Sequence, residues 1–180
     1  GVAFVSERCG YSLQCNELDK DETSCNLYVL GPDGAIRRLS VTKDGDYLPH
    51  VLSSGLIAYT RWEYHERSWA NIQSIWTVRP DGTGADAVFK QHLNDPWALE
   101  DARSIPGSRK LVATATGHHT LAAGPVVVID PAAGVNNPAG IRIGTPGVVP
   151  PEGGMSGTAV AEGGVRGRGG HYMQPWALSE

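Results

Sequence analysis

The fold is decided by the stretch Asp46-Tyr-Leu-Pro-His-Val-Leu-Ser-Ser-Gly55-Leu-Ile-Ala-Tyr-Thr60 and its continuation Ile75-Trp-Thr-Val-Arg-Pro-Asp-Gly82. It predicts a short strand that ends near Gly55, followed by strands over 56–61, 75–78 and 86–90. Pro80-Asp-Gly predicts a hairpin turn, because Pro presets φ, Asp bonds its own backbone and Gly accepts a positive φ. The apolar runs are continuous rather than alternating, which is typical of strands buried on both faces.

The same pattern recurs along the chain with a period near 50 residues. Leu27-Tyr-Val-Leu-Gly-Pro-Asp-Gly34 matches 75–82 at an offset of 48, and Val126–Pro131 is a weaker third copy a further 51 residues on. Pro96-Trp-Ala-Leu returns as Pro175-Trp-Ala-Leu at an offset of 79, which is one period plus an insertion of about 25 residues. The preceding strand recurs at 2–5, 56–59 and 111–114.

These repeats predict an all-β fold: a segment of a β-propeller with four-stranded antiparallel blades, roughly three blades plus the first strand of another. The expected parts are a partial blade over 1–43 with a cysteine-bearing acidic loop, complete blades over 44–93 and 94–146, a Gly/Pro-rich insertion over 147–170, and the first strand of the next blade over 171–180. An open segment of this kind exposes broad apolar blade faces. We therefore expect the remainder of a longer polypeptide, or partner subunits, to complete the propeller.

Composition argues against two classes of partner. The net charge of −4 and the sequence pI near 5.8 do not fit a nucleic-acid-binding protein, and Arg166 and Arg168 make only a weak basic patch. No apolar window approaches 18 residues, so no membrane span is expected. The chain opens on Val2-Ala-Phe-Val5 without the pattern of a signal peptide, and we expect a mature form or a piece of something longer.

Cys9, Cys15 and Cys25 lie within 17 residues of one another. We expect one disulfide that pins a long loop and leaves one thiol over. A metal site or a reactive thiol is the alternative, although Cys-x5-Cys-x9-Cys lacks the close spacing of a zinc knuckle. Cys-x-x-Cys-His does not occur, so no c-type haem is expected to attach to these residues.

The bulky polar run Arg61-Trp-Glu-Tyr-His65 follows the second strand of the central repeat. One hypothesis makes it a binding rim, in which Arg61, Trp62, Glu63 and Tyr64 contact a ligand together with Arg103. In the structural interpretation, which we prefer, Arg61 and Glu63 form ion pairs across blades and the aromatic rings fill the wedge between blades. A metal site is also conceivable: His65 would join His118 and His119, which follow the second strand of the next repeat.

The remaining polar features carry little chemistry. The acidic loop 17–22 offers oxygen ligands for calcium but lacks the spacing of a calcium loop, so we expect a solvated loop. His50 is expected to be a packed histidine facing a central channel. No nucleophile elbow, phosphate loop or dinucleotide fingerprint occurs, so catalysis within these residues has no support.

The Pro-Asp-Gly repeats resemble those of TolB-type propellers (WD40-like repeats). Several stretches further resemble the middle domain of the hydrazine synthase alpha subunit, a domain that also occurs in large secreted bacterial proteins: Tyr59–Tyr64, Ile72–Trp76, Ala102–Lys110, His118-His119 and Pro175–Glu180. The likeness covers nearly the whole chain, more weakly in the cysteine loop and the Gly-rich insertion. It implies a periplasmic or extracellular scaffold, and it carries over no haem-bearing residue.

The sequence therefore predicts a non-catalytic propeller scaffold or binding segment of a larger exported bacterial protein, with no cofactor in these residues. The first alternative is part of a haem-dependent redox enzyme of the hydrazine synthase type, whose haem sites lie outside this chain. The second is a metal-dependent enzyme that uses the rim of His65, His118 and His119 with zinc or calcium.

Overall fold

A computed structural model of the chain describes residues 1–10, 23–64, 72–118, 120–152, 155 and 171–179. These residues form an all-β fold, which confirms the predicted fold class. The strands are β1 (Val2–Ser6), β2 (Asn26–Leu30), β3 (Ile36–Arg38), β4 (Asp46–Val51), β5 (Ile57–Trp62), β6 (Gln73–Val78), β7 (Asp86–Phe89), β8 (Ala98–Ser104), β9 (Leu111–Thr116), β10 (Val126–Ile129) and β11 (Ile141–Ile143). Two short 3-10 helices, η2 (Pro131–Ala133) and η3 (Pro138–Gly140), lie between β10 and β11.

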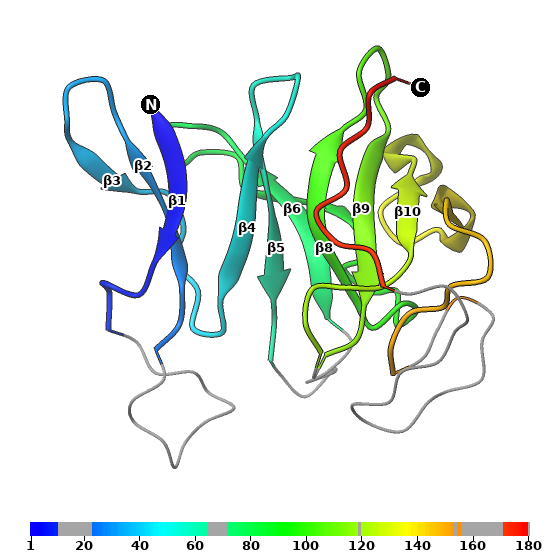
Figure 1. The fold of residues 1–180 in the computed structure, drawn as a ribbon. Helices are drawn as coiled ribbons and strands as arrows, with labels where there is room; N and C mark the ends of the chain where they lie inside the picture. Colours follow the sequence, from blue (N-terminus) through cyan, green and yellow to red (C-terminus); the bar gives the residue numbers. More distant parts are fainter. Residues whose placement is uncertain (11–22, 65–71, 119, 153–154, 156–170, 180) are drawn as a thin grey trace.

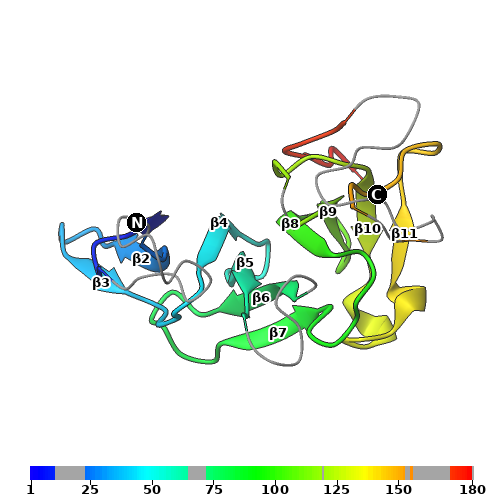
Figure 2. The same ribbon diagram turned by 90° about the horizontal axis from the view of Figure 1, so that it is seen from below.

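Three antiparallel units follow one another along the chain. Unit 1 is the sheet β1-β2-β3, unit 2 is β4-β5-β6-β7, and unit 3 is β8-β9-β10-β11. The units stand side by side in Figure 1, and the end-on view in Figure 2 shows them along an arc with β4 and β8 on its concave side. Neither sheet closes on itself among the described residues.

Consecutive units join at equivalent places, near the start of the strand that carries the repeated sequence. The Asp46 amide donates to the Cys25 carbonyl over 2.9 Å, which links unit 1 to unit 2. Gln73 pairs with Ala98 in the only parallel pair between β6 and β8, and this pair makes units 2 and 3 one mixed sheet. Gly124 bridges Tyr172 in the same manner. The strand expected over 171–180 is present only as this single bridge.

The Pro-Asp-Gly turns of units 1 and 2 share one hydrogen-bond pattern. The Gly31 amide donates to the Ala35 carbonyl over 2.9 Å, and the Arg79 amide donates to the Thr83 carbonyl over 3.0 Å. Gly34 and Gly82 occupy positive φ at 77° and 87°, as the turn requires. The third copy departs from this pattern, because helix η2 follows β10 in place of the tight turn.

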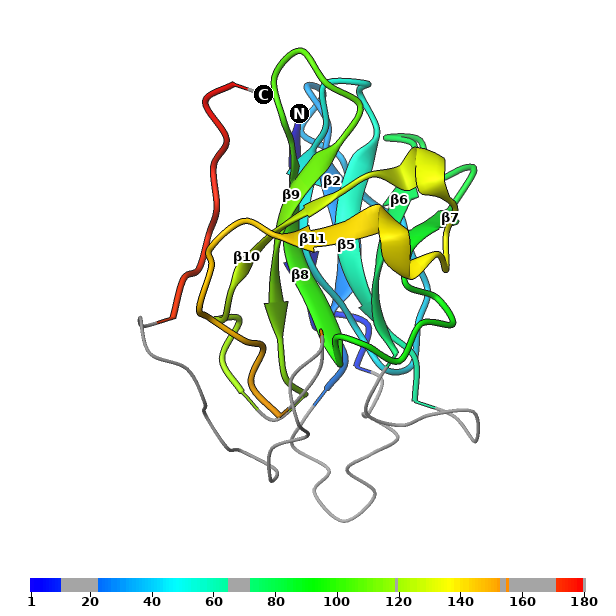
Figure 3. The ribbon, with the colours of Figure 1, turned by 90° about the vertical axis from the view of Figure 1, so that its right-hand side faces the viewer.

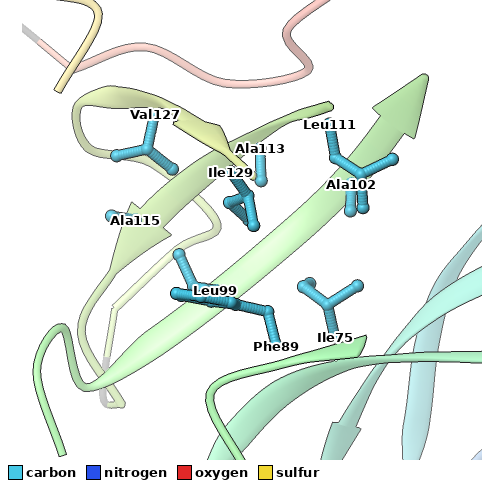
Figure 4. Close-up of a cluster of buried hydrophobic side chains, with 9 residues drawn as sticks. All are labelled: Ile75, Phe89, Leu99, Ala102, Leu111, Ala113, Ala115, Val127 and Ile129. Carbon is cyan, nitrogen blue, oxygen red and sulfur yellow. The ribbon is translucent and has the colours of Figure 1, made fainter. Parts of the chain in front are cut away.

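Apolar layers fill both junctions between units. Figure 4 shows the layer between units 2 and 3, whose members are fully or nearly fully buried: Ile75, Phe89, Leu99, Ala102, Leu111, Ala113, Ala115, Val127 and Ile129. The layer between units 1 and 2 consists of Leu27, Leu39, Ile57, Tyr59 and Val78. The central unit therefore presents a buried face on each side, as its continuous apolar runs predict.

The outer face of unit 1 carries an exposed apolar row. Val2, Leu30 and Ile36 are cross-strand neighbours in β1, β2 and β3, and they are 58%, 37% and 48% exposed. At the other end of the arc, Figure 3 looks onto β9, β10 and β11, where Val126 and Val128 are half-buried. No helix among the described residues is long and apolar enough to cross a membrane.

Candidate functional site

Arg61 is held in a buried ion pair rather than offered to a ligand. Its Nε and Nη2 donate to the two carboxylate oxygens of Asp46 over 2.8 and 3.0 Å, and the Asp46 side chain is fully buried. The guanidinium also lies over the rings of Trp76 and Tyr59, 4.7 and 5.4 Å from their centroids. Burial opposes the charged form of Arg61, but the hydrogen bond and charge of Asp46 outweigh burial and raise its pKa.

This pairing corrects the expectation that Arg61 forms an ion pair across blades. Asp46 and Arg61 are directly opposite residues of β4 and β5, so the pair lies within unit 2. The carboxylate is supplied by the neighbouring strand because a β-bulge between Tyr47 and His50 shifts the register by one residue. Without that shift Asp46 would face Trp62 on the opposite side of the sheet.

Trp62 and His118 meet where β5 and β9 end. The two rings are 4.9 Å apart between centroids, and Trp62 is 8% exposed. The Gln73 side-chain amide nitrogen lies within hydrogen-bond distance of His118 Nδ1. An amide nitrogen can only donate, so Nδ1 accepts and the ring proton resides on Nε2. In this state neither ring nitrogen presents a free lone pair to a metal.

Tyr64 is fixed through its backbone by the loop that precedes β4. Its amide donates to Asp44 Oδ2 over 2.8 Å, and its carbonyl accepts from Lys43 Nζ over 2.8 Å. The Tyr64 ring meets the Trp62 ring edge-on at 5.8 Å, and the Glu63 amide donates to the Ile72 carbonyl over 3.0 Å. The four candidates Arg61 to Tyr64 thus serve the packing and closure of unit 2.

The metal hypothesis finds no cluster in the described part of the chain. No group of three or more His, Cys, Asp or Glu residues is arranged there to hold an ion. His65 and His119 lie outside the described residues, as do the acidic loop 17–22 and the arginines Arg166 and Arg168. Zinc and calcium at those positions stay predictions.

Cys9 and Cys25 are both free thiols in the structure. The Cys9 thiol lies 3.7 Å from the Ser24 carbonyl and accepts from the Asn26 side chain over 3.3 Å. Burial, together with the charges of Glu7 and Cys9, raises the pKa of the Cys25 thiol, which disfavours the reactive thiolate. Cys15 lies outside the described residues, so a disulfide through it stays a prediction.

The innermost strands β4 and β8 share a backbone irregularity that brings a second set of polar residues together. Each has a β-bulge, between Tyr47 and His50 in β4 and between Glu100 and Arg103 in β8. A residue with positive φ stands in each bulge, Leu48 at 51° and Asp101 at 59°, and Gln174 adopts the same conformation at 53°. Two residues beyond these three positions lie His50, Arg103 and Trp176, which we call the inner row.

Asp101 ties two members of the inner row together. His50 Nε2 is hydrogen-bonded to its Oδ1, and Arg103 Nη2 donates to the same oxygen over 3.1 Å. Burial of Asp101 works to raise its pKa, but the hydrogen bonds from His50 and Arg103 outweigh burial and lower it. Arg103 also lies 4.9 Å from the ring centroid of Trp176. Glu100, its neighbour in β8, has its pKa raised to about 7 by burial and by Asp101.

Sequence reasoning named Arg103 and expected His50 to be packed, but it missed Asp46, Asp101 and Glu100. No motif marks these acids, because each owes its role to a bulge that local sequence does not reveal. An alignment of the repeats on the positive-φ residues, rather than on Pro-Trp-Ala-Leu, would have placed His50, Arg103 and Trp176 in one row.

The arrangement defines a repeated, open all-β array with a polar inner row and buried ion pairs. No protein-family model matches the chain, and no curated protein sequence matches it significantly.

Proposed function

We propose that the chain is a non-catalytic segment of a β-propeller, a scaffold or binding module within a larger exported bacterial protein akin to the hydrazine synthase alpha middle domain. The observation that carries this proposal is the repeated junction. Cys25 with Asp46, Gln73 with Ala98, and Gly124 with Tyr172 join successive units at equivalent positions. A junction that recurs with each repeat propagates the array in one sense, which is how blades are arranged around an axis.

The outer face of unit 1 supports the further proposal that other units, or partner subunits, pack against this segment. The inner face of unit 1 is covered, because Ala3, Val5 and Val29 pack against the buried layer shared with unit 2. The row of Val2, Leu30 and Ile36 on the outer face is apolar and exposed. In a propeller a blade buries both faces, so this row is where the preceding blade would pack.

The test is the association state of the chain and of a matched pair of variants. We expect the chain to self-associate at micromolar concentration, measured by sedimentation velocity. Ile36→Glu, which places a charge on the outer face of unit 1, should shift the distribution toward monomer. Val41→Glu is the control, because Val41 is 66% exposed but lies in the loop after β3. A monomer at every concentration, or equal effects of the two substitutions, would contradict the proposal.

A further inference from the structure

The inner row contains two basic side chains that share a single buried acceptor. The side chains of Asp101, Arg103 and His50 are 3%, 18% and 26% exposed, so the carboxylate is enclosed while both bases reach the surface. One carboxylate balances at most one of them, and the group carries a net positive charge whenever His50 is protonated. This imbalance favours an anion as the missing neighbour.

Each base keeps a donor position that no described residue uses. His50 contacts Asp101 through Nε2, and its Nδ1 has no partner in the described part of the chain. Arg103 directs Nε and Nη2 at Asp101, over 3.4 and 3.1 Å, which leaves Nη1 without a protein acceptor there. Because both bases are hydrogen-bonded to the same oxygen of Asp101, their remaining donors belong to one small region of the surface.

Trp176 gives this region an apolar wall. Its ring centroid lies 4.9 Å from the Arg103 guanidinium carbon, yet the residue is 73% exposed. A stacked guanidinium covers one face of an indole, and most of the Trp176 surface therefore remains open to a second planar group. Carboxylate recognition by Arg is planar as well, so a flat ligand fits both contacts.

We propose that His50, Arg103 and Trp176 form a binding site for a small aromatic carboxylate. The carboxylate accepts hydrogen bonds from His50 Nδ1 and Arg103 Nη1, and the aromatic ring packs against the indole of Trp176. Asp101 is a positioning residue, which orients both bases from beneath and does not contact the ligand.

Binding should strengthen as the pH falls. The titratable groups around His50 are Asp101, Glu100 and Arg103 from β8, and Tyr47 from β4. Burial, with the charges of nearby acids including Glu100, raises the pKa of Tyr47, so this phenol stays neutral. Glu100 has a pKa of about 7 and gains a proton on acidification, while His50 becomes a cation. Both changes make the region more positive, and the loss of the Glu100 charge alone contributes about tenfold between pH 8 and pH 6.

The experiment is calorimetric titration of the full chain with sodium benzoate at pH 6 and pH 8. We expect saturable binding that is at least several-fold tighter at pH 6, and a pH dependence that Glu100→Gln reduces. Arg103→Gln should weaken binding about tenfold or more, in line with the loss of one charged hydrogen bond. The matched control is Arg37→Gln, because Arg37 is an exposed arginine in unit 1 that pairs with Asp33 and lies in β3, away from the inner row.

Arg103→Gln also releases Asp101, so a second variant protects the test against a folding defect. Trp176→Ala removes only an exposed ring and should weaken benzoate several-fold while leaving acetate binding unchanged. Equal benzoate affinities for the parent, Arg103→Gln and Trp176→Ala proteins would overturn the proposal. Inorganic phosphate that binds as tightly as benzoate would overturn the stacking contact. None of these outcomes depends on Ile36 or on association of the units, so this test is separate from that of the propeller proposal.

Discussion

The ion pair between Asp46 and Arg61 is expected to be the most sensitive polar contact in unit 2. Asp46 has no exposed side-chain surface, and the Arg61 side chain is 15% exposed. Replacement of Asp46 by Asn keeps the size of the side chain but removes its charge. Arg61 cannot shed its proton, so the variant buries a cation without a counter-ion.

The cost follows from the burial of both partners. Removal of one partner of a buried ion pair typically destabilises a protein by about 3–5 kcal/mol. For a chain of this length, each kcal/mol lowers the melting temperature by about 2–4 °C, so Asp46→Asn should melt roughly 6–20 °C below the parent. Arg61→Met should cost at least as much, because it also removes the cation–π contacts with Trp76 and Tyr59.

The assay is a double-mutant cycle by urea unfolding, followed by tryptophan fluorescence and by circular dichroism to check for a single transition. The double variant Asp46→Asn/Arg61→Met should be less destabilised than the sum of the single variants by about 2–3 kcal/mol. The control is the exposed pair of Asp33 and Arg37, whose side chains are 51% and 57% exposed. Asp33→Asn should leave the unfolding midpoint unchanged within error. Additive effects at Asp46 and Arg61 would refute the argument that the pair acts as a unit.

Two further substitutions test the layer between units 2 and 3 and the buried cation beside it. Phe89→Ala should destabilise the chain by about 3–5 kcal/mol in the same urea assay, because the fully buried ring lies at the centre of that layer. Lys90 is fully buried, donates to the Trp97 carbonyl over 2.9 Å, and has its pKa lowered to about 7 by burial. The unfolded chain therefore binds the extra proton between pH 7 and about 10.4, so stability should rise with pH across that window and fall as the pH drops to 7. Lys90→Met should remove this slope, and a slope that persists in the variant would contradict the assignment to Lys90.

The strands were predictable because burial and turn chemistry are local in sequence. Leu56–Thr60 and Leu111–Thr114 are continuous apolar runs, and the structure buries β5 and β9 on both faces. The Pro-Asp-Gly turns form with the expected positive φ at Gly34 and Gly82. Boundaries moved by a residue or two, as for β6, which begins at Gln73 rather than Ile75.

The polar contacts were not predictable, because they depend on register. In β4, Val51 pairs with Ile57 and His50 with Ala58, whereas Asp46 pairs with Arg61 after a shift of one residue. A count along a regular hairpin would place Asp46 opposite Trp62 and leave Arg61 without a carboxylate in this unit. The hypothesis of ion pairs across blades arose from that missing carboxylate.

The repeat match at Pro175 was misleading for a related reason. Pro96 and Pro175 both precede Trp-Ala-Leu, but Pro96 follows a cis peptide bond before β8, whereas Pro175 follows the positive-φ residue Gln174. The backbone therefore aligns Gln174 with Asp101 and with Leu48. Similar letters mark different structural positions, and dissimilar letters mark the same one.

The bulge in the innermost strands thus separates what is repeated from what is particular to each unit. Its backbone recurs at Leu48, Asp101 and Gln174, so the requirement for a positive φ belongs to the repeat. The residues that follow it differ: His50, Arg103 and Trp176 are a titratable base, a permanent cation and an aromatic ring. Such variety has no value for packing identical units, and it is what a site with distinct polar and apolar contacts requires. A scaffold function for the array and a binding function for its inner row are therefore compatible properties of one repeated fold.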